Sequence, residues 1–474
     1  MTEARQTPEA RRRNRFDRRL IDHPRPRLAG EADALRHQGA ARPPTPMQWA
    51  ALTAALAVPA IALVLWPAVA GQALHHLFFL LFAAAALTRL AAAMTPRTSA
   101  PAPALDDAAL PTYTVIAPLY REAEVAAQLL AALDAVDYPR DRLQVLIVVE
   151  ADDGETRQAL AGLSLPRHVE VLVAPPGRPR TKPRACNIAL ERATGEIVTI
   201  YDAEDRPHPL QLREAAARLA AGSARLACLQ APLRLEPDRR FLPRQFAIEY
   251  AIQFETILPL LARLGLPFPL GGTSNHFRIS ALQAVGGWDA WNVTEDADLG
   301  FRLAAEGYDL GVLELPTVEV APDRLADWLP QRARWVKGYM QTFGVQTRRP
   351  PHWRTGVLLS FAVTLGVAIL AALAHGPLLA WSLMSVAAQL STGQGWLTLA
   401  DVTLLAAGWL CAMAAAVVGL RRAGAELRVR DLLLTPLYWP LLSLAAAHAL
   451  WQLVRCPHHW DKTRHAARTG QVAA

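Results

Sequence analysis

The chain has 474 residues, more than one ordinary soluble domain, and this length suggests about three structural units. Hydrophobic residues make up 52% of it, a high share for a soluble protein, yet charged residues still make up 19%. This mixture disfavours a wholly soluble protein and favours a polar domain joined to membrane segments. The net charge of +7 is unevenly distributed, so its location is more informative than its sum.

Residues 1–45 form a basic segment without apolar periodicity, and their prolines argue against a packed fold. We predict a disordered cytoplasmic arm that is held near anionic lipid headgroups. An arm that binds nucleic acid is the alternative, but we expect no nucleic-acid partner. The arginines that define the segment are Arg11, Arg12, Arg13, Arg15, Arg18 and Arg19.

Residues 46–95 are predicted to form a transmembrane hairpin. Residues 47–70 contain no charged residue, and residues 72–93 contain one arginine, Arg89. About 20 residues are enough to cross the hydrocarbon layer, so each segment is long enough. Basic residues before and after the pair favour the cytoplasmic side for both ends. A buried helix pair in a large soluble core is the alternative.

Residues 353–455 contain further apolar segments. Residues 355–375 and 399–420 are long enough to span, whereas residues 377–391 are short and suit an interfacial helix or a tilted span. Residues 431–454 lie between two basic segments, and a helix with both flanks on the cytoplasmic side cannot cross once. We therefore expect an interfacial or re-entrant helix there, followed by a basic cytoplasmic tail over residues 456–474.

Between these segments, residues 110–345 alternate short apolar runs with stretches of helical periodicity. Two helices are expected, near residues 122–136 and 185–193. This alternation predicts an α/β domain with a mostly parallel, doubly wound sheet. The expected strands are residues 113–117, 143–149, 169–173 and 197–201.

Two of these strands run directly into acidic clusters. Val149 is followed by Glu150-Ala151-Asp152-Asp153, and Tyr201 by Asp202-Ala203-Glu204-Asp205. Ligands of doubly wound sheets bind beyond the carboxyl ends of the strands. Carboxylates there can cap helices or form turns, but two adjacent clusters repel each other unless a positive group lies between them. A divalent metal that bridges a diphosphate meets that need.

The run Arg180-Thr181-Lys182-Pro183-Arg184 lies just before the helix expected near residue 185. Basic side chains beside a helix N-terminus suit a phosphate. A solvated basic loop is the alternative for any lone run of this kind.

Three further segments complete the candidate site. Gly271-Gly272-Thr273-Ser274 is a small, polar turn that a sugar can approach closely. Thr294-Glu295-Asp296-Ala297-Asp298 offers Asp296 as a general base, with Asp298 as the rival and a capped helix N-terminus as the alternative. In Gln331-Arg332-Ala333-Arg334-Trp335, Trp335 offers a platform for a sugar ring or an anchor at the membrane interface.

In this order, and between membrane segments, these motifs resemble those of inverting, membrane-integrated glycosyltransferases of family 2. The likeness is greatest to the cellulose synthase catalytic subunit and related bacterial β-glucan synthases, and it covers residues 110–345. It implies a GT-A-like (Rossmann-like) cytoplasmic domain inserted between transmembrane helices. The segment His459-Trp460-Asp461-Lys462-Thr463-Arg464-His465 also resembles a tail motif in a subgroup of these synthases.

The resemblance also implies roles for individual residues. Glu295 and Asp296 would be catalytic, with Asp296 as the base. Asp202, Glu204 and Asp205 would hold Mg²⁺ or Mn²⁺, although Glu204 stands where the family usually has aspartate, and Arg184 stands where lysine is commoner. The acceptor would meet Gly271, Gly272, Thr273, Ser274 and Trp335. The nucleotide sugar would be bound by Asp152, Asp153, Lys182, Arg184, Asp202, Gln331, Arg334 and Trp335.

The sequence thus predicts a multi-pass protein of the inner (plasma) membrane with its catalytic domain in the cytoplasm. We expect it to use a UDP-sugar, with UDP-glucose as the first candidate, to extend a β-linked polysaccharide processively and translocate it. Its partners would be the donor, a glycan acceptor, the lipid bilayer, and periplasmic or outer-membrane export proteins. The alternatives are transfer of one sugar to a polyprenyl phosphate or glycolipid, and a catalytically silent export subunit.

Overall fold

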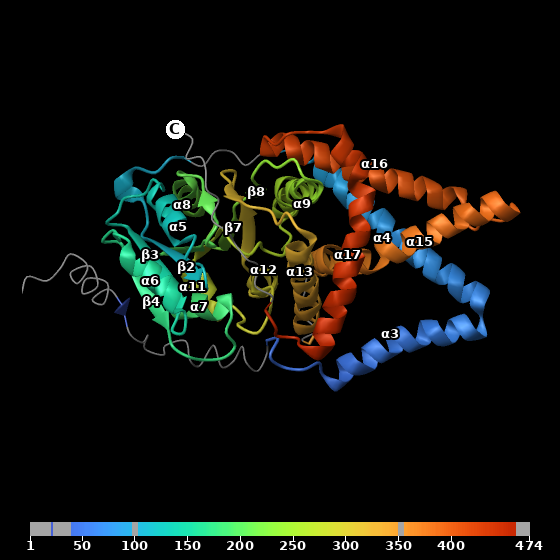
Figure 1. Cartoon of the computed structure of the whole chain (residues 1–474), viewed down its shortest axis with the longest axis horizontal. Helices are drawn as coiled ribbons and strands as arrows, with labels where there is room; N and C mark the ends of the chain where they lie inside the picture. The colour runs from blue at the N-terminus through green and yellow to red at the C-terminus, as the bar shows by residue number, and fades with distance from the viewer. Residues whose placement is uncertain (1–19, 22–38, 97–102, 349–354, 461–474) are drawn as a thin grey trace, which may run out of the picture.

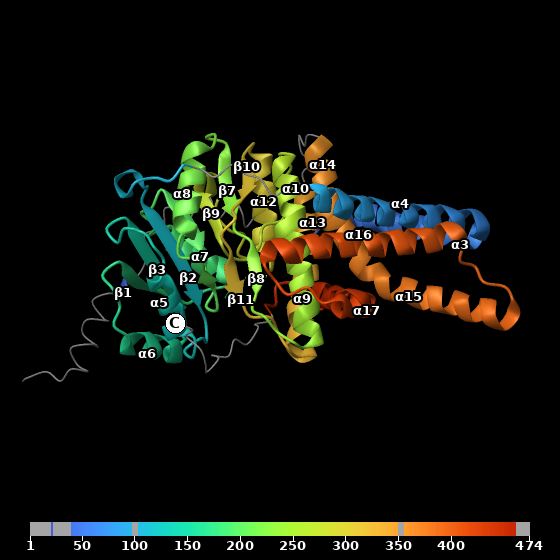
Figure 2. The ribbon, with the colours of Figure 1, turned by 90° about the horizontal axis from the view of Figure 1, so that it is seen from above.

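The computed structural model describes residues 20–21, 39–96, 103–348 and 355–460. An α/β domain lies at one end of the molecule, and long apolar helices project from the other (Figure 1). A layer of helices separates the two parts, as the view from above makes clear (Figure 2). The apolar segments that precede and follow the α/β domain in the sequence therefore lie at the same end of the molecule.

The α/β domain is built on an eight-stranded sheet. Its strands are parallel to their neighbours except for β9, which runs antiparallel to both β5 and β7. The predicted mostly parallel sheet is confirmed, and each of the four predicted strands begins at the first residue of the observed strand. In spatial order the strands are β1 (Leu20–Ile21), β4 (Val169–Ala174), β3 (Leu143–Glu150), β2 (Tyr113–Leu119), β5 (Ile197–Ile200), β9 (Asn275–Arg278), β7 (Leu226–Gln230) and β10 (Asp309–Val312).

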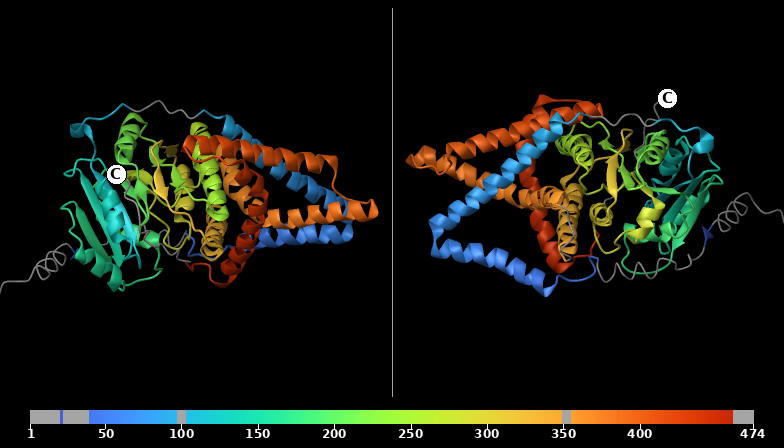
Figure 3. Two further views of the ribbon diagram at one scale, coloured as in Figure 1. Left: turned by 45° about the horizontal axis from the view of Figure 1, so that its top comes forward. Right: turned by 180° about the vertical axis from the view of Figure 1, so that it is seen from behind.

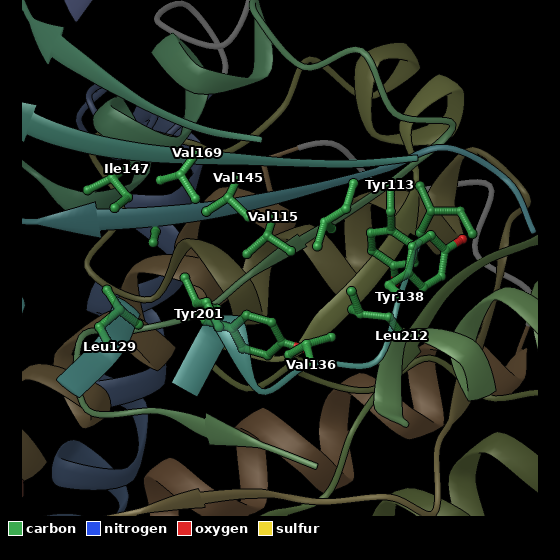
Figure 4. Packing of buried hydrophobic residues seen from close by; sticks show 14 of the residues in the cluster. Tyr113, Val115, Leu129, Val136, Tyr138, Val145, Ile147, Val169, Tyr201 and Leu212 are labelled. Atoms are coloured by element: carbon green, nitrogen blue, oxygen red, sulfur yellow. The ribbon is translucent and has the colours of Figure 1, made fainter. Parts of the chain in front are cut away.

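Both faces of this sheet are covered by helices, which explains why its strands are continuous apolar runs. On one face, alternate β2 residues such as Tyr113 and Val115 pack on helices α5 (Ala126–Asp134), α6 (Gly154–Gly162) and α8 (Gln211–Ala221), as Figure 4 shows. On the other face, Ile116 and its neighbours pack on α7 (Lys182–Leu190), α11 (Ile279–Ala284) and α12 (Glu295–Ala305). A short 3₁₀ turn, η1 (Asp107–Ala109), precedes β2.

A second, three-stranded sheet extends the domain toward the apolar helices. It contains β6 (Arg206–Pro207), β11 (Thr317–Glu319) and β8 (Leu233–Leu235). Behind it lies the layer of helices that separates the two parts of the molecule. This layer consists of α9 (Phe241–Ile252), the π-helical turn η2 (Gln253–Ile257), α10 (Leu258–Arg263) and α13 (Leu325–Gln346).

Five helices in the described part of the chain are long and apolar enough to cross a membrane, which indicates a membrane protein. The predicted hairpin is formed by α3 (Pro46–Leu65) and α4 (Pro67–Met94), which meet at Trp66. The others are the continuous helix 355–392, α16 (Leu399–Ala423) and α17 (Val429–Arg455). Figure 3 shows α4, α15 and α16 projecting from the same end of the domain.

The predicted separation of residues 355–375 from residues 377–391 is wrong. Both belong to one helix made of α14 (Thr355–Phe361), the π turn η3 (Ala362–Gly366) and α15 (Val367–Thr392). Pro377 does not end it, because Ser443 Oγ of α17 bridges the interrupted ladder. This oxygen accepts from the Gly376 N–H at 2.8 Å and donates to the Ala372 carbonyl at 2.6 Å. Such a bridge satisfies the backbone groups that a proline frees in an apolar helix.

Helix α17 runs in a different direction from the other apolar helices. In Figure 1 it lies across α4 and α16, and it packs alongside α13. Its length and composition would permit a span. Its direction, together with its basic flanks, favours the interfacial placement predicted from the sequence, which stays a prediction.

Within the predicted disordered arm, the structure describes residues 20–21 and 39–45, and some of these contact the rest of the chain. The Ala40 N–H donates to Asp289 Oδ2 at 2.6 Å, and the Arg348 guanidinium donates to the Gly39 carbonyl at 2.6 Å. Leu20 and Ile21 pair with β4 as strand β1. The rest of the predicted arm, residues 1–19 and 22–38, and residues 461–474 of the predicted tail lie outside the described residues.

The α/β domain is fastened to the apolar helices by buried polar contacts and by one close backbone approach. Arg244 of α9 pairs with Asp431 of α17 at 2.7 Å, and Arg422 of α16 donates to the Glu255 carbonyl at 2.8 Å. Gly419 of α16 packs directly on α9, where an added Cβ would lie 2.5 Å from the Ala251 carbonyl oxygen. These contacts hold the α/β domain and the apolar helices in a fixed relative position.

We predict that Gly419→Ala destabilises the protein by about 1–3 kcal/mol, because the new methyl group forces α16 away from α9. The matched control is Gly408→Ala in the same helix, where an added Cβ meets nothing within 4 Å. That change should leave stability unchanged or raise it by up to about 1 kcal/mol, because alanine favours helix. Thermal unfolding of both variants in detergent checks this, and equal melting temperatures would contradict it.

Candidate active site

A cavity of about 560 Å³ lies beyond the carboxyl ends of β2, β3 and β5. Its wall is shared between the α/β domain, the layer formed by α9, η2 and α13, and helices α15, α16 and α17. Most of the predicted site residues meet here. The titratable groups that line it around the strand ends include Glu122, Glu150, Arg180, Lys182, Asp202, Glu204, Glu295, Asp296, Glu319 and Arg334.

Lys182 is the cation on which three segments of this site converge. It is the first residue of α7, and its Nζ lies 2.5 Å from Asp202 Oδ1 and 2.5 Å from the Gly272 carbonyl oxygen. Burial alone would lower the pKa of Lys182, but the carboxylates of Asp202 and Glu295 raise it above its ordinary value. Lys182 is therefore a permanent positive charge between the acidic clusters.

Asp202 and Glu204 both line the cavity, as the sequence predicted. Beside them lies Glu319, which sequence reasoning missed. Burial first, and repulsion by neighbouring carboxylates second, raises the pKa of Glu204 and of Glu319 well above the ordinary value. Glu319 is the last residue of the short strand β11, so the rule that found the other strand-end acids applies to it as well.

Asp205, the third predicted metal ligand, does not line the cavity. Its side chain is 1% exposed, and its Oδ2 accepts from the Asp202 N–H at 2.7 Å and from the Thr273 hydroxyl. It thereby fixes the turn that carries Asp202 and joins that turn to the glycine-rich segment.

The remaining carboxylates fit a metal ion that arrives with a diphosphate. Among the described residues, no group of three or more His, Cys, Asp or Glu side chains is arranged to hold an ion by itself. Mg²⁺ is usually bound by one or two carboxylates together with phosphate oxygens and water. Asp202 and Glu204 provide that number, and the raised pKa of Glu204 shows a carboxylate in need of a counter-charge.

Glu295 and Asp296 form the first turn of α12, and both line the cavity. Burial is the main cause that raises the pKa of each carboxyl group, and the charge of Asp296 raises that of Glu295 further. Lys182 and Arg334 oppose this rise at both positions. Thr294 occupies the N-cap position but makes no capping hydrogen bond with its side chain.

Asp298, the rival base, points away from the cavity. It is 1% exposed and pairs with Arg302 at 2.7 Å, and its Oδ1 accepts from Gln346 Nε2 at 2.7 Å. These contacts join α12 to α13. Asp296 is thus the aspartate of this motif that reaches the cavity.

Gln331, Arg334 and Trp335 lie on one face of α13 and all three line the cavity. Residues three and four apart are neighbours on a helix surface, which explains the Gln-x-x-Arg-Trp spacing. Trp335 packs against Tyr250 and Phe246 at ring-centroid distances of 6.4 and 5.7 Å. Its aromatic face is thereby held by α9.

Sequence reasoning missed Arg332, which lies between these motif residues. Its guanidinium lies 4.1 Å from the Phe246 ring centroid and 4.6 Å from that of Trp335, and it pairs with Glu249. Glu249 also accepts from the Tyr438 hydroxyl at 2.6 Å. Arg332 therefore links α13, α9 and α17, and no local pattern marks such a contact.

The glycine-rich turn forms the wall next to Asp296. Gly271, Gly272 and Thr273 line the cavity, whereas Ser274 has a φ of 58° and donates to Thr317 Oγ1 at 2.6 Å. An added Cβ at Gly272 would lie 3.3 Å from Asp296 Oδ2. Glycine at this position keeps the space beside the carboxylate open.

Three predicted nucleotide ligands lie outside the cavity wall. Asp153 accepts from the Thr156 N–H at 3.2 Å and from the Arg121 N–H, so it caps α6. Asp152 pairs with Arg180, a lining residue, at 2.6 Å and is half exposed. Arg184 is turned toward Glu150, with which it pairs at 3.2 Å. Asp152 and Arg184 therefore each contact a residue of the cavity wall, Arg180 and Glu150 respectively.

The cavity continues from these polar groups into the apolar helices. Its far part is lined by small side chains of α15 and α16, among them Ala368, Ala371, Ala372, Ala412 and Ala416. Arg89 of α4 also lines it. Aromatic side chains line both parts and include Tyr250, Trp335, Tyr339, Trp409, Tyr438 and Trp439.

Comparison with known sequences identifies the family of the domain. A family described as "Glycosyl transferase family group 2" matches residues 197–420. The chain is 29% identical over 261 residues to cellulose synthase 1 catalytic subunit [UDP-forming] of Komagataeibacter xylinus, covering 52% of this chain and 33% of that protein. It is also 29% identical over 231 residues to the beta-monoglucosyldiacylglycerol synthase of Synechocystis, covering 47% and 46%. The chain thus spans a third to about half of the length of these relatives.

Comparison with solved structures identifies the fold. The mannosyltransferase PcManGT from Pyrobaculum calidifontis, solved in complex with GDP-Man and Mn²⁺, superposes with a TM-score of 0.52 at 20% identity. The match covers 80% of this chain and 97% of that one. The chain therefore carries a glycosyltransferase family 2 domain of GT-A-like fold, flanked by apolar helices that are long enough to cross a membrane.

Proposed function

We propose that the protein transfers a sugar, with inversion, from a UDP-sugar to the growing end of a β-linked polysaccharide. UDP-glucose is the first candidate donor. The observation that carries this proposal is the single cavity that joins Lys182 and Asp296 to aromatic side chains of α16 and α17. Aromatic rings are apolar platforms for sugar rings, so an acceptor chain can contact the wall on both sides of the reaction centre.

On the donor side, the leaving UDP is stabilised by positive charge. Lys182 and Arg334 point into the cavity and offset the negative charge that grows on the diphosphate as the glycosidic bond breaks. Asp202 and Glu204 would hold Mg²⁺ or Mn²⁺, which supplies Lewis-acid stabilisation of the same oxygens. Asp152 and Asp153 remain predictions as contacts of the nucleoside.

On the acceptor side, Asp296 takes the proton. The acceptor hydroxyl oxygen forms a bond to the anomeric carbon while the bond from that carbon to the diphosphate oxygen breaks, and the hydroxyl proton moves to the Asp296 carboxylate. Attack opposite the leaving group inverts the configuration. The Gly271-Gly272 backbone and the Trp335 ring would hold the acceptor sugar beside Asp296. Glu295 would contribute a second carboxyl group next to Asp296.

A second candidate function is transfer of one sugar to a polyprenyl phosphate or glycolipid. The observation that favours it is Arg89, a cation of an apolar helix that lines the far part of the cavity. Charged residues within membrane segments usually mark functional sites, and a guanidinium pairs well with a lipid phosphate. Arg89→Gln should abolish formation of such a lipid product but leave polymer extension largely intact.

The proposed setting is the inner membrane, with the catalytic domain in the cytoplasm, where UDP-sugars are made. The cavity would pass the product into the apolar helices, and export partners would receive it on the far side. Purified protein in lipid vesicles, given a panel of radiolabelled UDP-sugars with Mg²⁺ or Mn²⁺, tests the proposal. Ethanol-insoluble, β-glucanase-sensitive product supports it, chloroform-soluble product supports the second candidate, and no UDP release with any donor contradicts both.

We predict that Asp296→Asn lowers turnover by about 10²–10⁴-fold, because a general base typically contributes that much. UDP binding should be retained, since the amide keeps the shape of the carboxyl group. The matched control is Asp134→Asn on α5, whose side chain is 61% exposed and is not part of the cavity wall. UDP release and equilibrium UDP binding, measured on both variants, check this; equal turnover of Asp296→Asn and the wild type would remove Asp296 from its role.

The pH profile should show an acid limb above the ordinary aspartate value of 3.8, because burial raises the pKa of Asp296. Asp296 accepts a proton only when ionised, so kcat/KM rises with pH through this limb and then levels off. Arg334 opposes the rise in this pKa, so Arg334→Gln removes a positive charge and should move the limb to higher pH. Initial rates across the pH range check both statements, and an unmoved limb in Arg334→Gln would contradict the influence of this arginine on Asp296.

Removal of divalent ions with a chelator should abolish transfer, and added Mg²⁺ or Mn²⁺ should restore it. Removal of a side chain that only hydrogen-bonds to a metal ligand lowers metal affinity or activity by about 10–100-fold. Glu204→Gln removes a proposed ligand itself, so it should raise the metal concentration that gives a half-maximal rate by at least about tenfold. Glu204→Asp keeps a carboxylate and is the matched control. Titration of metal against initial rate checks this, and identical titration curves for the two variants would exclude Glu204 as a ligand.

A further inference from the structure

Five residues beyond α17, Cys456–Trp460, return to the catalytic cavity. Helix α17 ends at Arg455, and the segment that follows lies along α13 rather than leading away from it. Trp460 is part of the cavity wall, together with Glu295, Asp296 and Arg334. Nothing in the reaction described above uses this segment.

The segment is anchored by side chains of α13. The Lys337 Nζ, which is fully buried, donates to the His459 carbonyl at 2.8 Å and to Gln452 Oε1 of α17 at 2.8 Å. One turn further on, Gln341 Nε2 donates to the Pro457 carbonyl at 2.9 Å. A buried ammonium group held by two oxygens is a strong constraint, because leaving it unpaired would be costly. The backbone that leads to Trp460 is therefore fixed.

The same anchors reach the loop that carries the catalytic acids. Gln341 Oε1 accepts from the Val293 N–H at 3.1 Å, so one side chain holds both this loop and the returning segment. His458 Nδ1 lies 3.1 Å from the Trp291 carbonyl oxygen, and the two rings pack edge to face at 5.1 Å. The loop before α12 and the segment after α17 thus contact each other next to Glu295 and Asp296.

Trp460 contacts the key arginine of the Gln-x-x-Arg-Trp motif. The Arg334 guanidinium carbon lies 4.6 Å from the centroid of the Trp460 ring. Its Nη1 also donates to the Val293 carbonyl at 3.3 Å. Tryptophan is the best aromatic partner for a cation, and a guanidinium stacked on a ring can still donate hydrogen bonds from its edge. Such an arginine is oriented before a diphosphate arrives.

We propose that Cys456–Trp460 is a built-in part of the active site, in which Trp460 is a positioning residue that orients Arg334 toward the leaving diphosphate. This inference rests on the proposed function, because Arg334 acts there on the diphosphate. Trp460 acts through Arg334, so its effect disappears when Arg334 is absent. It also explains why the chain returns to the cavity after its last apolar helix.

The test is a double-mutant cycle on the full chain in lipid vesicles, with the most active UDP-sugar as the probe. The variants are Trp460→Ala, Trp460→Phe, Arg334→Ala and the double variant Trp460→Ala/Arg334→Ala. The matched control is Trp451→Ala, the same change at a side chain of α17 that is 58% exposed. Initial rates give kcat and KM, and thermal unfolding in detergent shows which variants fold.

We expect Trp460→Ala to lower kcat/KM about tenfold, the size of a cation–π contact in a partly desolvated site. Trp460→Phe should retain most of the activity, and Trp451→Ala all of it. In the Arg334→Ala background, Trp460→Ala should have no further effect. Equal factors for Trp460→Ala in both backgrounds would overturn the proposal, because they would show a role independent of Arg334.

Two further outcomes are decisive. If Trp460→Ala unfolds, the cycle is run with Trp460→Leu instead. If Trp460→Leu and Trp460→Phe both lose activity while their melting temperatures stay normal, an aromatic face at this position is not what the site needs. If the wild type turns over no donor, the proposed function fails. UDP binding then replaces the rate in the same cycle, and equal weakening by Trp460→Ala with and without Arg334 overturns the positioning role.

Discussion

Mutual repulsion among carboxylates is the constraint on which the site depends. Asp202 and Glu204 follow β5, Glu319 ends β11, and Asp296 lies in the first turn of α12, so three segments bring carboxyl groups to one cavity. Such a cluster is stable only if cations or protons offset it. Lys182 and Arg334 are cations of the cavity wall, yet burial first and neighbouring carboxylates second raise the pKa of Glu204 and of Glu319. The site therefore favours a ligand that arrives with a divalent cation, as a metal-bound diphosphate does.

The position of Lys182 also divides the site into two halves. Its ammonium group is bound to Asp202 and to the Gly272 carbonyl, and the Gly272 backbone borders Asp296. The carboxylates that would hold the metal thus lie on one side of Lys182, and the carboxylate that would take the proton lies on the other. A reaction that separates a leaving group from an attacking group needs this arrangement, because one carboxylate cannot serve both.

What the sequence could predict was local. The strands and the acids that follow β5 could be predicted from spacing along the chain; the strands are confirmed, and Asp202 and Glu204 line the cavity. The contacts that spacing does not encode were missed or misjudged. Arg332 finds Glu249 about eighty residues away, and Ser443 closes the helix ladder at Pro377 from another helix. Arg184 resembles a phosphate ligand in sequence but is neutralised by Glu150, which only the folded chain reveals.

The alignment of the catalytic domain with the apolar helices follows from the same long-range contacts. The cavity wall is contributed by both parts, so a shift between them would break the path of an acceptor. Arg332 joins α13 to Glu249 and thereby to Tyr438 of α17, while Arg244 and Asp431 join α9 to the start of α17. Breaking a buried ion pair by removing one partner is strongly destabilising. These pairs therefore hold the polar part of the cavity and the part between the apolar helices in a fixed relative position, as the proposed extension of one chain would require.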